Sequence, residues 1–266
     1  MAAEPLVREL PRAAPSVDRE VPDASRSADR ILPRADHVER GPGRKFFSWY
    51  QYVVPAILFP VSYALWLRRF GGDHALAILA LSLPVLFAYA IPGLGANWLG
   101  LWELNTRLRI GRMRPHHGFV FGTATSLFAL ACVPPASAPS GLGECLRAGF
   151  VLGSVLGFWN WLYDTHAIKS GFIVVHTRLA AEGRAAEVVA TDHAPILFGV
   201  FGLCYGVVLR LVERVTPGHW DYWALVVVGN LAAVALPVLA YVFASYLRHG
   251  ESGLKAYRGP LTGGNS

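Results

Sequence analysis

Histidine and acidic side chains gather in two short polar stretches of this chain. Five of its nine histidines lie there, His116 and His117 in the first stretch and His166, His176 and His193 in the second. Imidazole and carboxylate groups are the usual protein ligands of zinc and non-haem iron, and both also transfer protons near neutral pH. The two stretches therefore predict one site, for acid–base chemistry or for an iron or zinc ion.

Two aspartates border the same histidines. Asp164 comes two residues before His166, and Asp192 directly precedes His193. We predict Asp164, His166 and Asp192 as catalytic groups and all five histidines as metal ligands. The histidine spacing repeats no recurring metal-binding motif, so a second interpretation stays open. In it the aspartates cap helix ends, or Asp164 pairs with Lys169, and the histidines contact lipid phosphate.

A basic run precedes the first histidine pair. It contains Arg107, Arg109, Arg112 and Arg114 within eight residues. Guanidinium groups bind phosphate through paired, charge-assisted hydrogen bonds, so Arg107, Arg112 and Arg114 are candidates for binding an anionic lipid or a substrate phosphate. The excess of positive charge that is usual in cytosolic loops explains the same run without a ligand.

Long apolar helices must position these polar stretches. Apolar residues form 53% of the 266 residues and charged ones 16%, a balance that favours a membrane over a soluble core. A helix needs about 20 apolar residues to cross a bilayer. We predict an all-α integral membrane protein, a bundle of about six transmembrane helices. The predicted spans are residues 46–67, 75–91, 118–133, 148–163, 194–209 and 222–247.

Two of the six predicted spans are short. Residues 148–163 and 194–209 are runs between charged side chains, each about 24 Å long at 1.5 Å per residue. That length is marginal for a hydrocarbon core about 30 Å thick. A full crossing and a re-entrant path both remain open for these two segments.

The two ends of the chain differ from the bundle. Residues 1–45 hold eight of the 18 acidic side chains and nine of the 24 lysines and arginines, and they lack an apolar face. We predict a disordered cytosolic arm there and a cytosolic tail over residues 248–266. Ten basic side chains fall in loops and tail on the side of the N-terminus and five on the other side, which predicts that both termini are cytosolic. The expected location is a bacterial-type plasma membrane.

The chain after the second span predicts an interfacial segment. A proline and two glycines end the helix near Ile91, and residues 96–107 fit an amphipathic helix lying in the membrane surface. Glu103 and Arg107 have the spacing of four residues that allows an ion pair along such a helix.

The second polar stretch allows two predictions. Residues 179–190 are rich in alanine and fit a helix that Gly183 interrupts. Alternatively, residues 172–178 pair with residues 186–192 as a hairpin across that glycine. Either arrangement returns the histidines of this stretch to the membrane surface.

Charge and motifs exclude several classes of function. The net charge of +6 is explained by the loops of a membrane protein, so nucleic acid is not an expected partner. The P-loop, the GxGxxG dinucleotide motif, the GxSxG elbow and the HExxH zinc motif are missing from the sequence. Hydrolysis of ATP is therefore not expected.

Three functions fit the pattern. The first is an enzyme of lipid metabolism that acts on a lipid, isoprenoid or other apolar substrate at the cytosolic interface, with iron or zinc if the histidines bind a metal. The second is a transporter in which Asn160, Asp164 and Glu103 line a path for an ion or small solute. The third is a non-catalytic scaffold subunit. The expected partners are membrane lipids, together with an apolar small molecule or another membrane protein.

Overall fold

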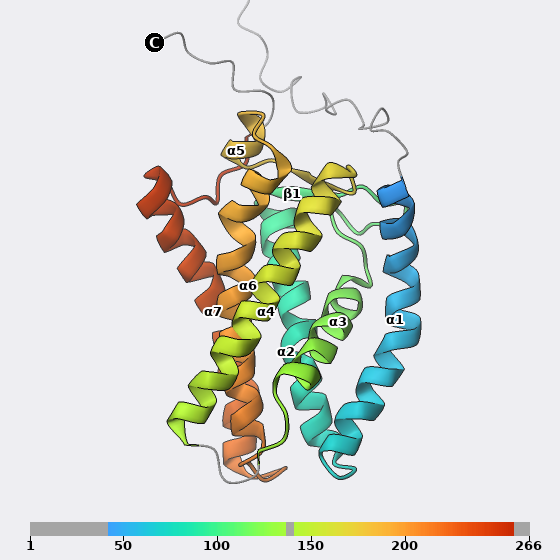
Figure 1. Cartoon of the computed structure of the whole chain (residues 1–266), viewed down its shortest axis with the longest axis vertical. Coiled ribbons are helices and arrows are strands. Elements are labelled where there is room, and N and C mark those ends of the chain that lie inside the picture. Colours follow the sequence, from blue (N-terminus) through green and yellow to red (C-terminus); the bar gives the residue numbers. More distant parts are fainter. Residues whose placement is uncertain (1–41, 137–140, 258–266) are drawn as a thin grey trace, which may run out of the picture. The chain divides into compact units, whose positions relative to one another are not determined.

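The protein is a bundle of helices with a two-stranded sheet at one end (Figure 1). The computed structural model describes residues 42–136 and 141–257. Residues 1–41, which make up most of the predicted arm, and residues 258–266 of the predicted tail lie outside the described residues.

The described residues form seven α-helices, one π-helix and two strands. The helices are α1 (Pro42–Arg69), α2 (His74–Pro92), η1 (Gly93–Trp98), α3 (His117–Cys132), α4 (Leu142–Lys169), α5 (Arg178–Ala181), α6 (Ala186–Val212) and α7 (Trp220–His249), and the strands are β1 (Trp102–Leu104) and β2 (Ile173–Val175).

Five helices are long and apolar enough to cross a membrane, namely α1, α2 with its continuation η1, α4, α6 and α7. Each of these five segments contains between 25 and 30 residues. Helix α3 is apolar but shorter, with 16 residues. These helices confirm the predicted all-α membrane bundle of about six helices.

Helices α4 and α6 are longer than the uncharged runs from which they were predicted. Both helices continue past the charged residues that bound these runs, and those charged side chains form ion pairs. Glu144 and Arg147 pair at 2.7 Å near the start of α4, and Lys169 at its end pairs with Glu187 at the start of α6. The 28 residues of α4 extend about 42 Å at 1.5 Å per residue, enough for a full crossing.

Tryptophans mark both ends of the bundle. Trp49 near the start of α1 and Trp98 at the end of η1 are 73% and 79% exposed at the sheet end. Trp220 and Trp223 are similarly exposed at the start of α7, at the opposite end. Amphipathic indole rings are enriched where a membrane protein meets the headgroup layers, so their positions fit a protein that crosses the bilayer.

The closest contact in the bundle joins α4 and α6, which run antiparallel side by side (Figure 1). Glycines replace side chains along this contact. A Cβ atom added at Gly153 would lie 2.6 Å from the Gly199 carbonyl oxygen, so the two backbones leave no room for one. The glycines of the contact are Gly149, Gly153 and Gly157 on α4 and Gly199, Gly202 and Gly206 on α6.

A buried ion network joins the helices at the end away from the sheet. The Glu213 carboxylate accepts from Arg69 at 2.6 Å and from Arg210 at 3.1 Å. Arg210 also donates to the Pro134 carbonyl at 2.8 Å, and Arg69 donates to the Val133 carbonyl. The network therefore links α1, the segment after α3 and the end of α6.

The sheet joins the two polar stretches. Strands β1 and β2 are antiparallel and pair Trp102 with Val175, Glu103 with Val174 and Leu104 with Ile173. Alternation along a strand turns Trp102 and Glu103 to opposite faces.

Two predictions of local structure are wrong here. The predicted interfacial helix over residues 96–107 ends at Trp98, and β1 follows it. The predicted hairpin of residues 172–178 with 186–192 does not form, because β2 pairs with β1 and α6 begins at Ala186. The predicted helix over residues 179–190 is divided between α5 and α6 by a turn in which Gly183 has a φ of +72°.

The α4–α6 contact predicts a large cost for a single methyl group. We expect Gly153→Ala to lower the free energy of unfolding by about 1–3 kcal/mol, because overpacking forces the backbones apart. Gly143→Ala is the matched control, since a Cβ at that helical position meets nothing within 4 Å. Thermal unfolding in detergent measures both variants. Equal stability of the two would contradict the proposed role of the glycines.

Candidate functional site

A cavity of about 300 Å³ lies between the β1–β2 sheet and the helices. Its walls come from α2, η1, α3, α4, α6, α7 and the sheet, together with loop residues and Leu254 from the segment after α7. Most of these side chains are aliphatic or aromatic, as in known small-molecule sites. The few polar groups in the wall therefore decide what chemistry the cavity supports.

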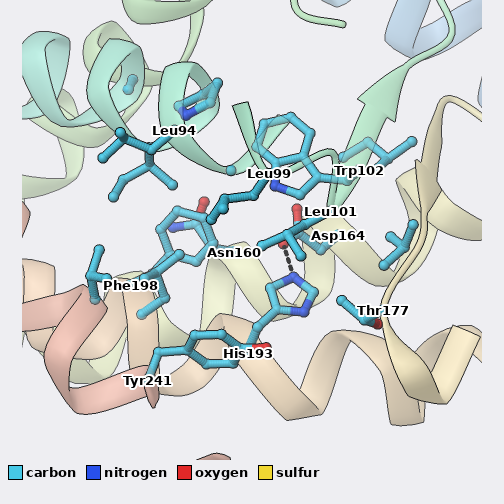
Figure 2. Close-up of a pocket in the computed structure, with 18 of the residues that line it drawn as sticks. Leu94, Leu99, Leu101, Trp102, Asn160, Asp164, Thr177, His193, Phe198 and Tyr241 are labelled. Carbon is cyan, nitrogen blue, oxygen red and sulfur yellow. Dashed lines mark hydrogen bonds and ion pairs between the residues drawn. The ribbon is translucent and has the colours of Figure 1, made fainter. Parts of the chain in front are cut away.

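An Asp–His pair forms the polar centre of the cavity wall (Figure 2). The Asp164 Oδ2 atom of α4 lies 3.0 Å from the Nε2 atom of His193 on α6. The side chains are 12% and 23% exposed, so water reaches the pair only in part. The imidazole is also anchored at its other nitrogen, because Nδ1 lies 3.0 Å from the Val189 carbonyl oxygen.

The backbone contact determines the protonation pattern of His193. A carbonyl oxygen only accepts hydrogen bonds, so Nδ1 of His193 carries a hydrogen. Nε2 then either donates to an Asp164 carboxylate or accepts from a protonated Asp164 carboxyl group. Both forms of the pair have zero net charge, which limits the cost of placing ionisable groups beside apolar side chains.

Asn160 lies in the same wall, one helical turn before Asp164, as their spacing predicts (Figure 2). Its Nδ2 atom donates to the Leu156 carbonyl at 2.8 Å within α4. Among the described residues, no hydrogen bond occupies the second Nδ2 hydrogen or the side-chain carbonyl oxygen, so both are available to a molecule in the cavity.

A buried arginine supports the opposite part of the wall. Arg114 is 2% exposed, and its guanidinium lies over the Phe172 ring at 5.7 Å. Its Nε donates to Nδ1 of His117 at 3.1 Å. Because Nδ1 accepts, neutral His117 carries its hydrogen on Nε2, and both His117 and Tyr163 line the cavity.

The other predicted histidines lie away from the cavity. His166 is exposed on α4, and its Nδ1 lies 2.8 Å from the Leu162 carbonyl of the same helix. His176 lies 3.8 Å from Glu103 on the sheet. His116 packs on the Tyr52 ring, and burial together with the nearby positive charge of Arg114 lowers its pKa.

Asp192 has a different environment from its neighbour His193. Its carboxylate lies 2.8 Å from His249 Nε2 and 3.3 Å from Arg248, both at the end of α7. Arg248 also donates to the Asp192 carbonyl at 2.8 Å. The contacts of Asp192 therefore hold α7 against α6.

The predicted ligands do not converge on one point. Within residues 42–136 and 141–257, no three His, Cys, Asp or Glu side chains are grouped so that they could hold one metal ion. The structure therefore does not support the predicted iron or zinc site.

Two predicted ion pairs are also wrong. Glu103 lies in a strand, so it meets Arg109 and His176 at 3.8 Å rather than Arg107. Lys169 pairs with Glu187 across the helices.

The basic run before His116 has no common role. Arg114 is buried against the Phe172 ring, whereas Arg107 is exposed. The Arg112 guanidinium lies against Gly100, where a Cβ would be 2.0 Å from its Nη1. Of the three predicted phosphate-binding arginines, Arg114 is hydrogen-bonded to a side chain of the cavity wall, that of His117.

Sequence patterns did not predict several residues of the cavity wall. Trp102, Tyr241 and Leu254 come from three separate parts of the chain and line the cavity together with Asp164 and Asn160 (Figure 2). The spacing of Asn160 and Asp164 was the available signal for the site. No local pattern connects the other three residues with it, because they meet only through the packing of α7 and the sheet.

Comparison of the chain with protein-family models, with curated proteins and with solved structures gives no match. The class of protein, a multi-pass helical membrane protein with an apolar cavity and a buried Asp–His pair, therefore follows from its own residues.

The two cavity histidines should differ at Nδ1, which is protonated in His193 and unprotonated in neutral His117. In ¹⁵N-histidine-labelled protein in detergent at pH 8, we expect a proton on Nδ1 of His193 and, for His117, on Nε2 alone. The variants His193→Gln and His117→Gln assign the two ¹⁵N signals. A signal from His193 with an unprotonated Nδ1 would contradict the hydrogen bond to Val189.

Proposed function

We propose that the chain is a membrane enzyme that transfers a proton to or from an apolar substrate held in the cavity. The observation that carries the proposal is the Asp164–His193 pair in the wall of an otherwise apolar cavity. Paired ionisable groups with one exchangeable proton between them are suited to general acid–base catalysis. A lipid, an isoprenoid or another apolar molecule is the substrate class that such a cavity favours.

Asp164 is the general acid or base in this proposal. His193 holds the Asp164 carboxyl group by a hydrogen bond and balances the charge that proton transfer creates. In the ion-pair form, the Asp164 carboxylate takes a proton from a substrate O–H or C–H bond. The resulting substrate anion is then balanced by the His193 imidazolium. In the neutral form, the Asp164 carboxyl group gives its proton to the substrate and the carboxylate remains.

His193 is held in place for this role at both of its nitrogens. The Val189 carbonyl and the Asp164 carboxylate orient the ring, so little reorganisation is needed when the proton moves. Asp192 and His166, the other two predicted catalytic residues, are not needed in this scheme.

Packed aromatic rings on the side of the cavity away from the sheet favour an enzyme over a transporter. Phe87 stacks on Phe201 with ring centroids 4.1 Å apart, and Phe121 packs on Phe198 at 5.4 Å. We call these four rings the aromatic floor. An ion or solute crossing the bundle would have to displace the floor, whereas a substrate reaching Asp164 would not. Glu103, the third predicted transport residue, is on the sheet and paired with Arg109.

The proposed location is a bacterial-type plasma membrane with the sheet end in the cytosol. Arg107, Arg109 and Arg112 lie in the chain between β1 and α3, Arg178 begins α5, and Arg184 lies between α5 and α6. These charges support that orientation by the positive-inside rule. Membrane lipids would then be both solvent and partner of the protein.

The proposal predicts which variants lose activity. Purified protein is incubated in liposomes of bacterial lipid extract, and the lipids are followed by mass spectrometry. We expect Asp164→Asn and His193→Gln to slow the conversion by about 10²–10⁴-fold, the usual contribution of a general acid or base. In D₂O, a proton transferred to carbon would appear as deuterium in the product.

A second His–Asp pair in the chain provides the matched control. His219 and Asp221 lie 2.9 Å apart, exposed, at the opposite end of the bundle. His219→Gln and Asp221→Asn should therefore retain wild-type conversion. Wild-type rates in correctly folded Asp164→Asn protein would refute the proposed role of the cavity pair.

A further inference from the structure

We infer that the cavity receives its ligand sideways from the bilayer, through an opening between η1 and α7, and that this ligand is an uncharged lipid with a hydroxyl group. In the proposed function this lipid is the substrate, and the placement of its hydroxyl at Asp164 rests on that function. The route of entry does not depend on turnover.

The cavity is covered on the side of the polar loops. Leu101, Trp102 at the start of β1 and Leu254 from the segment after α7 form the cover. Main-chain hydrogen bonds of 2.7 Å hold it, from the His176 N–H to the Leu101 carbonyl and from the Tyr257 N–H to the His176 carbonyl. A ligand entering from the water would have to break these bonds.

Ion pairs strengthen the same cover. Arg178 lies 3.7 Å from Glu251, which joins α5 to the segment after α7. The Tyr257 hydroxyl donates to Glu251 at 2.7 Å, and this hydrogen bond raises the pKa of Tyr257. With the aromatic floor on the far side, two directions of approach are closed.

One lateral approach to the cavity runs between α2, with its continuation η1, and α7. Two hydrogen bonds join these helices in the half of the bundle away from the sheet, Tyr222 to the Ala75 carbonyl at 3.2 Å and Asn230 to Ser82 at 3.3 Å. Nearer the sheet, Val238 of α7 lies in the cavity wall, and the second half of α7, whose end is held against α6 by Asp192, diverges from α2 (Figure 1). Among the described residues, no side-chain hydrogen bond joins α2 to α7 in this half, where the cavity lies.

The rim of this opening is apolar and exposed. Leu94, Trp98 and Leu99 line the cavity, yet 41%, 79% and 36% of their surfaces are accessible from outside. The Leu99 N–H donates to the Leu94 carbonyl at 2.9 Å, the five-residue bond of a π-helix, which widens the helix at this point. Such a rim is stable in contact with acyl chains, so lipid rather than water faces it.

The polar groups of the wall select the head of the ligand. Asp164 already has its charge balanced by His193, so neither a cation nor an anion would find a counter-charge there. Among the described residues, the Oδ1 atom of Asp164 accepts no hydrogen bond, and one N–H of Asn160 is unused. A hydroxyl group fits both, because it donates to Asp164 and accepts from Asn160.

Photolabelling tests the route and the ligand together. The probes are decanol and decanoate, each carrying a diazirine, added to the full-length protein in liposomes and mapped by mass spectrometry. We expect labelling of Leu94, Val238 and Tyr241 by the alcohol, saturable by unlabelled decanol, and at least tenfold weaker labelling by decanoate. Labelling that stays linear with probe concentration, or equal labelling by the two probes, would overturn the inference.

A bulky residue at the rim tests the opening itself. Leu94→Trp should reduce saturable labelling of Tyr241 at least tenfold, whereas Ile57→Trp, at an exposed position on α1 outside the cavity wall, should not. Thermal unfolding confirms that both variants are folded. Undiminished labelling in Leu94→Trp would refute lateral entry.

The two proposals can fail separately. Saturable alcohol labelling with unchanged conversion in Asp164→Asn supports the opening and refutes the acid–base role. Loss of conversion in Asp164→Asn with linear labelling supports the enzyme and refutes the lateral route.

Discussion

The close approach of α4 and α6 is the constraint on which the rest of the structure depends. In a bilayer, helices gain little from burying apolar side chains against each other, so packing must come from backbones that come near enough to touch. The glycines of α4 and α6 allow this, and the Cβ of Gly157 would lie only 3.2 Å from the Pro195 carbonyl. His193 lies two residues before Pro195 on α6, and Asp164 lies about two helical turns after Gly157 on α4. The glycine contact thus brings together two side chains that are 29 residues apart in sequence.

The Asp–His pair explains how ionisable groups persist in such an apolar setting. One uncompensated charge there would cost several kcal/mol. The Asp164–His193 pair has zero net charge, and the Val189 carbonyl oxygen accepts a hydrogen bond from the other imidazole nitrogen. The same neutral pairing leaves one proton that can move between the two side chains without changing their net charge. Stability and reactivity therefore depend on the same two side chains.

Predictions from sequence succeeded for the helices and failed for the segments between them. Long apolar runs have one stable structure in a bilayer, since every backbone N–H and C=O must be bonded internally. The ends of α4 were less predictable, because Lys169 continues the helix through its pair with Glu187, on another helix. A strand such as β1 is stable only beside a partner, and its partner β2 lies about 70 residues further on. No local pattern near Glu103 reveals that partner.

For the site, the sequence by itself determined the residue types and the membrane setting. The polar stretches, the spacing of Asn160 and Asp164 and the apolar composition all follow from it. Only the tertiary structure decided which histidine meets which carboxylate. His193 faces Asp164 while the adjacent Asp192 faces His249, because successive residues of a helix point about 100° apart and meet different neighbours. The cavity exists only between elements far apart in the chain, so its shape depends on their packing.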